Sequence, residues 1–278
     1  MVATPIGHAR DITLRALDIL ASADVLAAED TRSLRRLMEI HGIALNGRQV
    51  VAYHDHNGPR ARPGLLRALA AGQSVAYASE AGTPLIADPG FDLVREAIAE
   101  GYAVTTAPGP TAMATAVTIA GLPTDRVLFA GFVPSARSGR RKALAELRDV
   151  PATLVFYESP KRLAAFLADA QDVLGDRPAA VCRELTKKFE QARRGLLSDM
   201  VQEQAETPAR GEIVVVVDRG RSSKLSTSDL DDALRRALGT MSVRDAADFV
   251  SVSLNLPRRQ VYQHAMKVKR DDDPAGAE

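Results

Sequence analysis

The segment SEAGTPLIADPG, residues 79–90, combines carboxylates, hydroxyls, prolines and glycines within twelve positions. It follows the apolar run AYA and precedes FDLVREAIAEG, which has the apolar spacing of a helix. A connection between a strand and a helix normally takes about two to six residues. A longer, conformationally stiff loop at the carboxyl end of a strand is where open α/β sheets bind ligands. This segment is therefore the first candidate for a ligand-binding loop.

Other short segments of similar composition follow predicted strands. They are TPIG (4–7), AEDTR (28–32), YHDHN (53–57) and PGPTA (108–112). Because the carboxyl ends of parallel strands lie on one edge of a sheet, we expect all these loops to line one crevice. Small residues, hydroxyls and carboxylates predominate in them, which suits a ligand with an amine, a ribose and a soft positive centre better than one with phosphates. The alternative is that the loops are stiff only to satisfy the geometry of the fold.

Several familiar catalytic motifs are missing from the sequence. No GxGxxG follows the first predicted strand, no GxxxxGK[ST] occurs, and no GxSxG is present. His54 and His56 flank Asp55, and the alternation could direct both rings to one side. Two imidazoles are too few ligands for a convincing metal site, so we expect no metal and assign this turn to the lining of a substrate cleft.

The elements that position these loops alternate between strands and helices up to residue 122. We predict parallel strands joined by right-handed helical crossovers, with Asp11 capping the first helix. A helix of small residues follows PGPTA and ends at Gly121. The predicted strands are DVLAAED, QVVAY, SVAYAS and AVTTA, and the predicted helices between and around them are ITLRALDILASA, SLRRLMEIHG, GLLRALAAG and FDLVREAIAEG.

Two further regions are predicted, at 123–220 and 221–278. The first has strands at VLFAGF, TLVFYE, AAVCRE and EIVVVV, with helices KALAELRD, RLAAFLADAQDVLG and LLSDMVQEQ. The second begins with a polar linker, RSSKLSTSD, and ends in the acidic run DDDPAGAE. Between them lie two helical patterns joined by LNLP, with Pro257 suited to the first position of the second helix. We predict an α/β fold of two α/β domains with a small helix-turn-helix-like extension, although this helical pair could instead only pack on the main body.

The net charge of +1 gives no global field that favours nucleic acid. Basic residues nevertheless cluster locally, and three clusters favour a polyanionic partner over the alternative of solvated surface. The clusters are Arg137, Arg140, Arg141 and Lys142; Lys187, Lys188, Arg193 and Arg194; and Arg258, Arg259, Lys267, Lys269 and Arg270.

The only cysteine, Cys182, permits neither an intrachain disulfide nor a thiolate zinc site, and we predict that it is buried in a strand. The amino terminus lacks the pattern of a signal peptide, and no apolar run is long enough to cross a bilayer. We therefore expect a soluble, cytoplasmic protein.

The order of these motifs resembles the tetrapyrrole methylase superfamily across nearly the whole chain. The tail, SVRDAADFVSVSLNLPRRQVYQHAMKV, resembles the helix-turn-helix extension of the branch that methylates small-subunit ribosomal RNA. This chain has Glu80 where that branch usually has Asp, and His8 where it usually has Asn. The segments that carry the resemblance are TPIGHARDITLRAL, AEDTR, HDHN, SEAGTPLIADPG, PGPTA, TLVFYESPKRL, RELTKKFE and RGEIVVVV.

The resemblance implies a homodimeric enzyme that binds S-adenosylmethionine between two α/β domains. Its reaction would be methylation of a cytidine ribose 2′-hydroxyl in the decoding region of 16S ribosomal RNA, within the small ribosomal subunit. The positions that match the family's cofactor-binding motifs are Pro5, Gly7, Ala81, Gly82, Thr83, Ile86, Thr111, Ala112, Phe156, Tyr157, Glu158, Gly211 and Glu212. Two alternatives remain open, a tetrapyrrole or corrinoid precursor C-methyltransferase and a non-catalytic RNA-binding protein.

Methyl transfer to a ribose hydroxyl needs in-line geometry and a base or cation that favours an alkoxide-like transition state. The candidates for this role are Lys187, Glu184, Asp30 and His54, in that order. Lys187 could alternatively anchor a phosphate. The predicted RNA contacts are Arg137, Arg140, Arg141, Lys142, Arg258, Arg259, Lys267 and Lys269.

Overall fold

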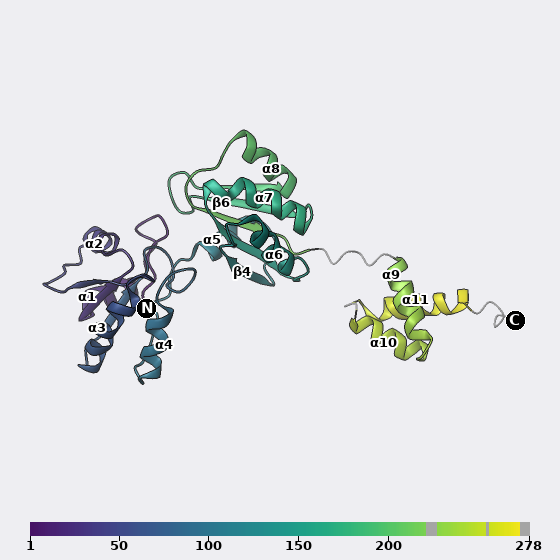
Figure 1. Ribbon diagram of the computed structural model, residues 1–278, viewed down its shortest axis with the longest axis horizontal. Coiled ribbons are helices and arrows are strands. Elements are labelled where there is room, and N and C mark those ends of the chain that lie inside the picture. The colour runs from purple at the N-terminus through teal and green to yellow at the C-terminus, as the bar shows by residue number, and fades with distance from the viewer. Residues whose placement is uncertain (221–226, 254–255, 273–278) are drawn as a thin grey trace. The chain divides into compact units, whose positions relative to one another are not determined.

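The computed structural model describes residues 1–220, 227–253 and 256–272 (Figure 1). The chain divides into two compact units, residues 1–220 and 221–278. This division coincides with the predicted boundary after Gly220. Residues 273–278 of the predicted acidic end and residues 221–226 of the predicted linker lie outside the described residues.

Unit 1 begins with a parallel three-stranded sheet of order β2-β1-β3. Its strands are β1 (Val25–Ala28), β2 (Val50–Ala52) and β3 (Val75–Ala78). The helices that alternate with them are α1 (Leu14–Ser22), α2 (Thr31–Ile40), α3 (Gly58–Ala70) and α4 (Phe91–Ala99). The predicted alternation and the parallel pairing are confirmed. A parallel sheet brings the loops after β1 and β3 to the same edge, since these two strands are neighbours.

The predicted strand AVTTA does not form. Only Ala107 makes a bridge, to Val2, and Val2 makes a second bridge to Ala78. The amino terminus thus lies between β3 and residues 105–107, but the ladder is too short for a regular strand. Residues 103–106 are largely exposed beyond it and lack the apolar packing that would extend the pairing.

The first helix begins later than predicted, so its cap is Thr13 and not Asp11. The Thr13 hydroxyl accepts a hydrogen bond from the Ala16 amide at 3.2 Å. A hydroxyl at this position satisfies one of the amides that a helix start leaves free.

The second sheet of unit 1 has five strands in the order β4-β5-β8-β6-β7. β4 and β5 pair in parallel, and the other pairs are antiparallel. The strands are β4 (Val127–Gly131), β5 (Thr153–Glu158), β6 (Pro178–Arg183), β7 (Gln191–Leu196) and β8 (Ile213–Val217), and the helices are α6 (Arg137–Leu147), α7 (Pro160–Leu174) and α8 (Leu197–Glu206). β7 was not predicted, because its sequence QARRGL is an edge strand with few apolar residues.

Helix α5 (Ala112–Ala120) covers one face of this second sheet. Its Ala116 and Ala120 pack in one cluster with Val155, Val214 and the buried Cys182, whose predicted burial is confirmed. A boundary after residue 122 would therefore separate α5 from the sheet it packs against, and that boundary remains a prediction. The other face of the sheet carries the largest core, built from β5, β6, β8 and the helices α6–α8.

The described part of unit 2 contains helices α9 (Thr227–Leu238), α10 (Val243–Ser253) and α11 (Arg258–Asp272). The predicted pair of helices is present as α10 and α11, and α9 completes a small core with them around Leu234, Val250 and Val261. Pro257 precedes α11 and does not occupy its first position. Its carbonyl accepts from the Gln260 amide at 2.9 Å. No helix among the described residues is long and apolar enough to cross a membrane.

Candidate active site

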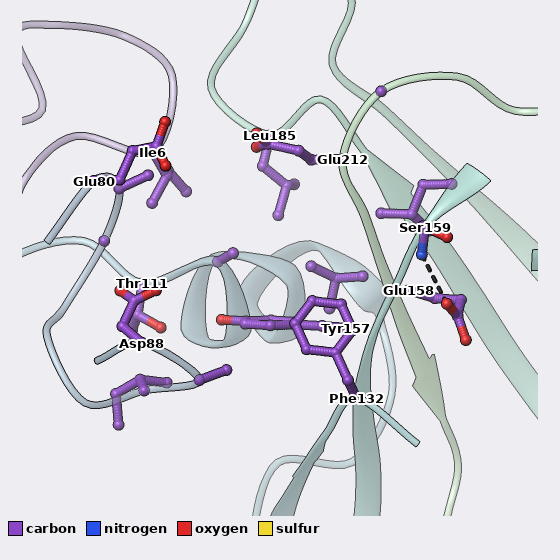
Figure 2. Close-up of a pocket in the computed structure, with 18 of the residues that line it drawn as sticks. Ile6, Glu80, Asp88, Thr111, Phe132, Tyr157, Glu158, Ser159, Leu185 and Glu212 are labelled. Carbon is purple, nitrogen blue, oxygen red and sulfur yellow. Dashed lines mark hydrogen bonds between the residues drawn. The ribbon is translucent and has the colours of Figure 1, made fainter. Parts of the chain in front are cut away.

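A cavity of about 440 Å³ opens in unit 1 among the loop 79–90, the PGPTA turn and the ends of β5 and β8. All of the predicted cofactor-binding positions lie along it except Pro5, Gly7 and Phe156. Its walls thus come from both sheets of unit 1, and Figure 2 shows Ile6 and Glu80 facing Leu185 and Glu212 across it.

Hydrogen bonds within the loop 79–90, and from it to the amino terminus and the PGPTA turn, hold this wall of the cavity. Thr4 and Gly82 exchange backbone hydrogen bonds of 2.9 Å in both directions, and the Ser79 hydroxyl donates to the Gly82 carbonyl at 2.6 Å. The Thr83 hydroxyl donates to the Pro110 carbonyl at 3.0 Å, which ties this loop to the PGPTA turn. The backbone is therefore fixed without a ligand, as an ordered binding loop requires.

Asp88 is the titratable group of this wall that the sequence reasoning did not single out. Partial burial, together with the charges of Glu29 and Glu80, raises the pKa of Asp88 to about 7. Its neighbours Leu85 and Ala87 adopt φ angles of 73° and 59°, in the left-handed region that side-chain-bearing residues seldom occupy. Such backbone strain concentrates at ligand-binding loops. The positive φ angles at Leu85 and Ala87 could not be predicted from the sequence.

An aromatic wall faces this loop. The rings of Phe132 and Tyr157 lie 5.7 Å apart between centroids, at 70° to each other (Figure 2). The Tyr157 hydroxyl accepts from the Met113 amide at 3.1 Å, and the Thr111 hydroxyl is buried beside it without a hydrogen bond of regular geometry. Phe132 was missed by the sequence reasoning, although it is the last residue of the predicted strand VLFAGF.

Phe156 and the carboxylate of Glu158 do not contribute as predicted. Successive residues of β5 point to opposite faces, so Phe156 lies in the core with its ring 5.1 Å from Phe166. The Glu158 carboxylate turns away from the neighbouring Tyr157 and accepts from the Ser159 amide at 2.8 Å (Figure 2). Burial raises its pKa. Glu158 therefore supports the wall and does not present its charge to the cavity.

Lys187, Glu184 and Glu212 form a charged cluster at the rim. The Lys187 ammonium lies 3.1 Å from a carboxylate oxygen of each glutamate. The Glu212 amide donates to Glu184 at 3.0 Å, and this bond is the main cause that lowers the pKa of Glu184. Partial burial opposes the charge on Lys187, but the hydrogen bonds to both carboxylates raise its pKa overall. Lys187 is thus a fixed cation and not a free base at neutral pH.

The loop that carries Lys187 lies directly on the TPIG turn. A Cβ on Gly7 would lie 2.6 Å from Lys187 Cγ and 2.8 Å from the Leu185 carbonyl oxygen. The His8 amide also donates to the Thr186 hydroxyl at 3.1 Å. Gly7 therefore permits contact between the amino-terminal turn and the connection between β6 and β7.

A second cavity of about 530 Å³ lies beside the first, and Glu80 lines both. Pro5, Gly7 and Asp30 line this second cavity, so the structure does not place Asp30 with the Lys187 cluster. The Asp30 carboxylate caps α2 by accepting from the Arg32 amide at 2.7 Å. That hydrogen bond is the main cause that lowers its pKa.

His54 lines neither cavity, so the prediction that YHDHN joins the same crevice is wrong. The reason is sheet order, because β2 is separated by β1 from β3, whose loop forms the cavities. The His54 amide donates to the Asn57 side chain at 2.8 Å, and the ring stands 6.1 Å from that of His56. Among the described residues, no three His, Cys, Asp or Glu side chains are grouped as metal ligands would be.

The predicted RNA contacts of α6 need one correction. Arg140 is buried and pairs with the buried Asp169 at 2.7 Å, so its guanidinium cannot reach a phosphate. Arg137 and Arg141 also contact Asp169, but Arg137 and Lys142 remain exposed. On α11, the predicted residues Arg258, Arg259, Lys267 and Lys269 are all exposed, and the Arg258 guanidinium pairs with the Asp248 carboxylate of α10.

Comparison with known proteins now decides the family. The family described as "Tetrapyrrole (Corrin/Porphyrin) Methylases" matches residues 1–201. The chain belongs to the tetrapyrrole methylase family. The "RsmI C-terminal HTH domain" matches residues 225–269, so the predicted resemblance is confirmed in both parts of this tetrapyrrole methylase.

Curated relatives match over almost the full length. A protein of Mesorhizobium japonicum named "Ribosomal RNA small subunit methyltransferase I" is 45% identical over 97% of this chain and 91% of its own. A protein of the same name from Halalkalibacterium halodurans is 40% identical over 94% of this chain and 92% of its own.

Solved structures confirm the fold at low identity. A cobalt precorrin-4 methyltransferase aligns with a TM-score of 0.60 at 17% identity, over 78% of this chain and 93% of its own. A diphthine synthase aligns with a TM-score of 0.59 at 16% identity, over 78% of this chain and 90% of its own.

The cavity fits the S-adenosylmethionine on which this family depends. Its volume lies in the range of small-molecule sites, which is roughly 300–1,000 Å³. The residues that line it include no lysine or arginine, whereas Asp88 and Glu212 are acidic. Such a lining suits a cationic sulfonium and amine, and the rings of Phe132 and Tyr157 suit a nucleobase.

Proposed function

We propose that this protein transfers a methyl group from S-adenosylmethionine to the ribose 2′-hydroxyl of a cytidine in the decoding region of 16S ribosomal RNA. The observation that carries the proposal is a single cavity, suited to a cationic nucleoside donor, with the fixed ammonium of Lys187 at its rim. The names of the relatives and the matched carboxy-terminal domain support RNA of the small subunit as the substrate class.

The cofactor supplies an electrophilic methyl group on a sulfonium. In the reaction an oxygen–carbon bond forms as the carbon–sulfur bond breaks. S-adenosylhomocysteine is the leaving group, and the proton of the ribose hydroxyl passes to solvent water. The chain contributes by holding the hydroxyl in line and by stabilising the negative charge that develops on its oxygen.

We assign that stabilising charge to Lys187. Because hydrogen bonds to Glu184 and Glu212 raise its pKa, Lys187 cannot accept the hydroxyl proton but can attract the developing alkoxide. Glu184 is a positioning residue in this scheme, since its lowered pKa makes it a weak base and its carboxylate holds the ammonium. Asp30 and His54 are assigned no role in this step, because neither lines the first cavity.

Contacts to the RNA backbone are assigned to exposed basic residues. On α11 these are Arg258, Arg259, Lys267 and Lys269, and on α6 they are Arg137 and Lys142. Arg141 is half-buried and engaged with Asp169 and Asp172, so it contributes less. Binding that rests on such contacts weakens steeply as salt is added.

The test uses purified protein, labelled S-adenosylmethionine and small ribosomal subunits that lack this methylation. The expected product is 2′-O-methylcytidine, identified by mass spectrometry of nuclease-digested RNA. Methylation on a base, or methyl transfer only to a porphyrin or corrin precursor offered in parallel, would contradict the proposal. Failure to bind S-adenosylhomocysteine by calorimetry would favour a non-catalytic RNA-binding protein.

We further propose that the protein is a homodimer, as the resemblance implies, and that it is located in the cytoplasm. Sedimentation equilibrium measures the first, where a mass of about twice 29.8 kDa is expected. Fractionation of cells that express a tagged chain measures the second.

A further inference from the structure

The connection between β6 and β7, residues 184–190, presents an aromatic ring to solvent at its tip. Phe189 is 64% exposed, and the Lys188 ammonium lies 5.5 Å from the centroid of its ring. Within the described chain, no carboxylate lies within ion-pair distance of Lys188. Proteins that bind single-stranded nucleic acid commonly combine exposed aromatic side chains, on which bases stack, with nearby cationic side chains, which contact phosphates.

The loop behind this tip is rigid. Glu184 and Thr186 have φ angles of 52° and 62°, so two side-chain-bearing residues hold left-handed conformations. The Thr186 amide donates to the Glu190 carboxylate at 2.6 Å, and the Glu190 amide donates to the Lys187 carbonyl at 3.1 Å. A tip that is ordered in advance loses little conformational entropy when a ligand stacks on it.

The tip is also close to the proposed chemistry. Phe189 lies two residues from Lys187, which bounds its backbone distance at about 7 Å from the rim of the cavity. A ribose 2′-hydroxyl cannot enter this cavity while its nucleotide remains stacked within a folded RNA. An aromatic ring next to the rim would replace the stacking contacts that a base loses when it leaves the RNA stack.

We propose that Phe189 and Lys188 form a stacking platform for an unstacked nucleobase of the RNA, at or next to the methylated nucleotide. Phe189 stacks on the base and Lys188 contacts the adjoining phosphate. This inference rests on the proposed function and adds a recognition site to it. The occupant is single-stranded RNA and not a protein or a second copy of the chain, because the ring is paired with an uncompensated cation and stands beside the rim of the cavity.

The chain offers a matched control in Phe91. Phe91 is 65% exposed and has the Arg95 guanidinium 5.4 Å from its ring centroid, so its exposure resembles that of Phe189, although Arg95 also pairs with Asp92. It begins α4 and lines neither cavity. Any effect of exposed aromatic surface as such would therefore appear equally in F91A and F189A.

The experiment measures methylation kinetics of small subunits with the full-length chain and its variants F189A, F189Y, K188A and F91A. For F189A we expect the KM for subunits to rise roughly 5- to 150-fold with little change in kcat, the range for loss of one base–aromatic stack. F189Y should stay within about threefold of the parent, since it retains a ring, and F91A should match the parent. K188A should weaken binding, and the slope of log affinity against log salt concentration should fall by about one, because one phosphate contact is lost.

A photocrosslink supplies a readout independent of turnover. RNA that carries a 5-iodopyrimidine beside the target nucleotide should crosslink at Phe189, and F189A should lose that crosslink. An unchanged KM and crosslink in F189A would overturn the inference while parental methylation left the proposed function intact. Loss of S-adenosylhomocysteine binding in F189A, or a change in its sedimentation, would also overturn it, since the ring would then support the loop or a subunit contact.

Discussion

Replacement of Gly7 by alanine tests whether the amino-terminal turn positions Lys187. The new Cβ would lie 2.6 Å from Lys187 Cγ, whereas ordinary contacts begin near 3.4 Å, so the loop must move by about 0.8 Å. The Leu185 carbonyl oxygen at 2.8 Å belongs to the backbone, and therefore a side-chain rotation alone cannot relieve the overlap. Overpacking of this kind costs about 1–3 kcal/mol. For a unit of this size, that corresponds to a melting temperature lower by roughly 2–12 °C.

The effect on turnover should be larger than the effect on stability. A displacement near 1 Å at a reacting group can cost about a hundredfold in rate. We therefore expect G7A to lower kcat about 10- to 100-fold, while its affinity for S-adenosylhomocysteine stays near that of the parent, because Gly7 does not line the first cavity.

The assays are labelled methyl transfer to small subunits, calorimetry with S-adenosylhomocysteine and thermal unfolding. The control is G64A in α3, where the nearest atom to the new Cβ is an Arg67 nitrogen at 3.9 Å. G64A should unfold slightly above the parent, since alanine favours a helix over glycine by about 1 kcal/mol. If G7A methylates within twofold of the parent, the contact between this turn and the Lys187 loop is not what sets the rate.

Four further predictions concern three single side chains. K187M should lower kcat roughly a hundredfold with little change in the KM for RNA, and loss of RNA affinity with normal turnover would instead support phosphate anchoring. The pKa of Asp88 is raised to about 7, so the native state binds one more proton than the unfolded state between about pH 4 and 7. The free energy of unfolding therefore falls as pH rises through that window. D88N should melt several degrees above the parent at pH 8 and at the same temperature as the parent below pH 4. Ionisation of Asp88 also favours a cationic donor, so affinity for S-adenosylmethionine should rise between pH 6 and 8 in the parent and stay flat in D88N. R140A should cost about 3–5 kcal/mol of stability by leaving the Asp169 carboxylate buried without its closest partner, yet leave the salt dependence of RNA binding unchanged, which titration at two ionic strengths would check.

The class of the fold followed from sequence periodicity because buried strands and amphipathic helices carry strong local patterns. β8, with the sequence IVVVV, is buried along its whole length and was unmistakable. β7, with QARRGL, was missed because an edge strand is held by backbone pairing to β6 and needs few apolar side chains. The strand AVTTA was predicted because it continues the alternation of strands and helices, yet pairing with the short amino terminus leaves only Ala107 in a bridge.

The candidate site divides in the same way. The loop 79–90 was predictable because its length and composition depart from an ordinary turn. The prediction that His54 lines the same crevice was wrong for a different reason. The strand order of the sheet determines which loops lie side by side, and local sequence patterns do not reveal that order. The burial of Arg140 could not be predicted from the sequence either. Its partner Asp169 lies 29 residues away, and only the packing of α6 on α7 brings the two charges together.

The position of the Lys187 ammonium shows how much of a site can depend on strand register. Arg183 at the end of β6 pairs with Ile213 at the start of β8, and this pair places Glu184 beside Glu212 just beyond it. A Cβ on the preceding residue, Gly211, would lie 2.2 Å from the Glu184 carboxylate, so the two glutamates can meet around the ammonium only because that residue is glycine. A slip of one residue between β6 and β8 would move Glu212 out of register with Glu184, so Lys187 would keep only the glutamate of its own loop. Backbone pairing in the second sheet therefore helps to set the geometry of the proposed catalytic cation, because it brings Glu212 beside Glu184 and Lys187 although Glu212 is distant from both in sequence.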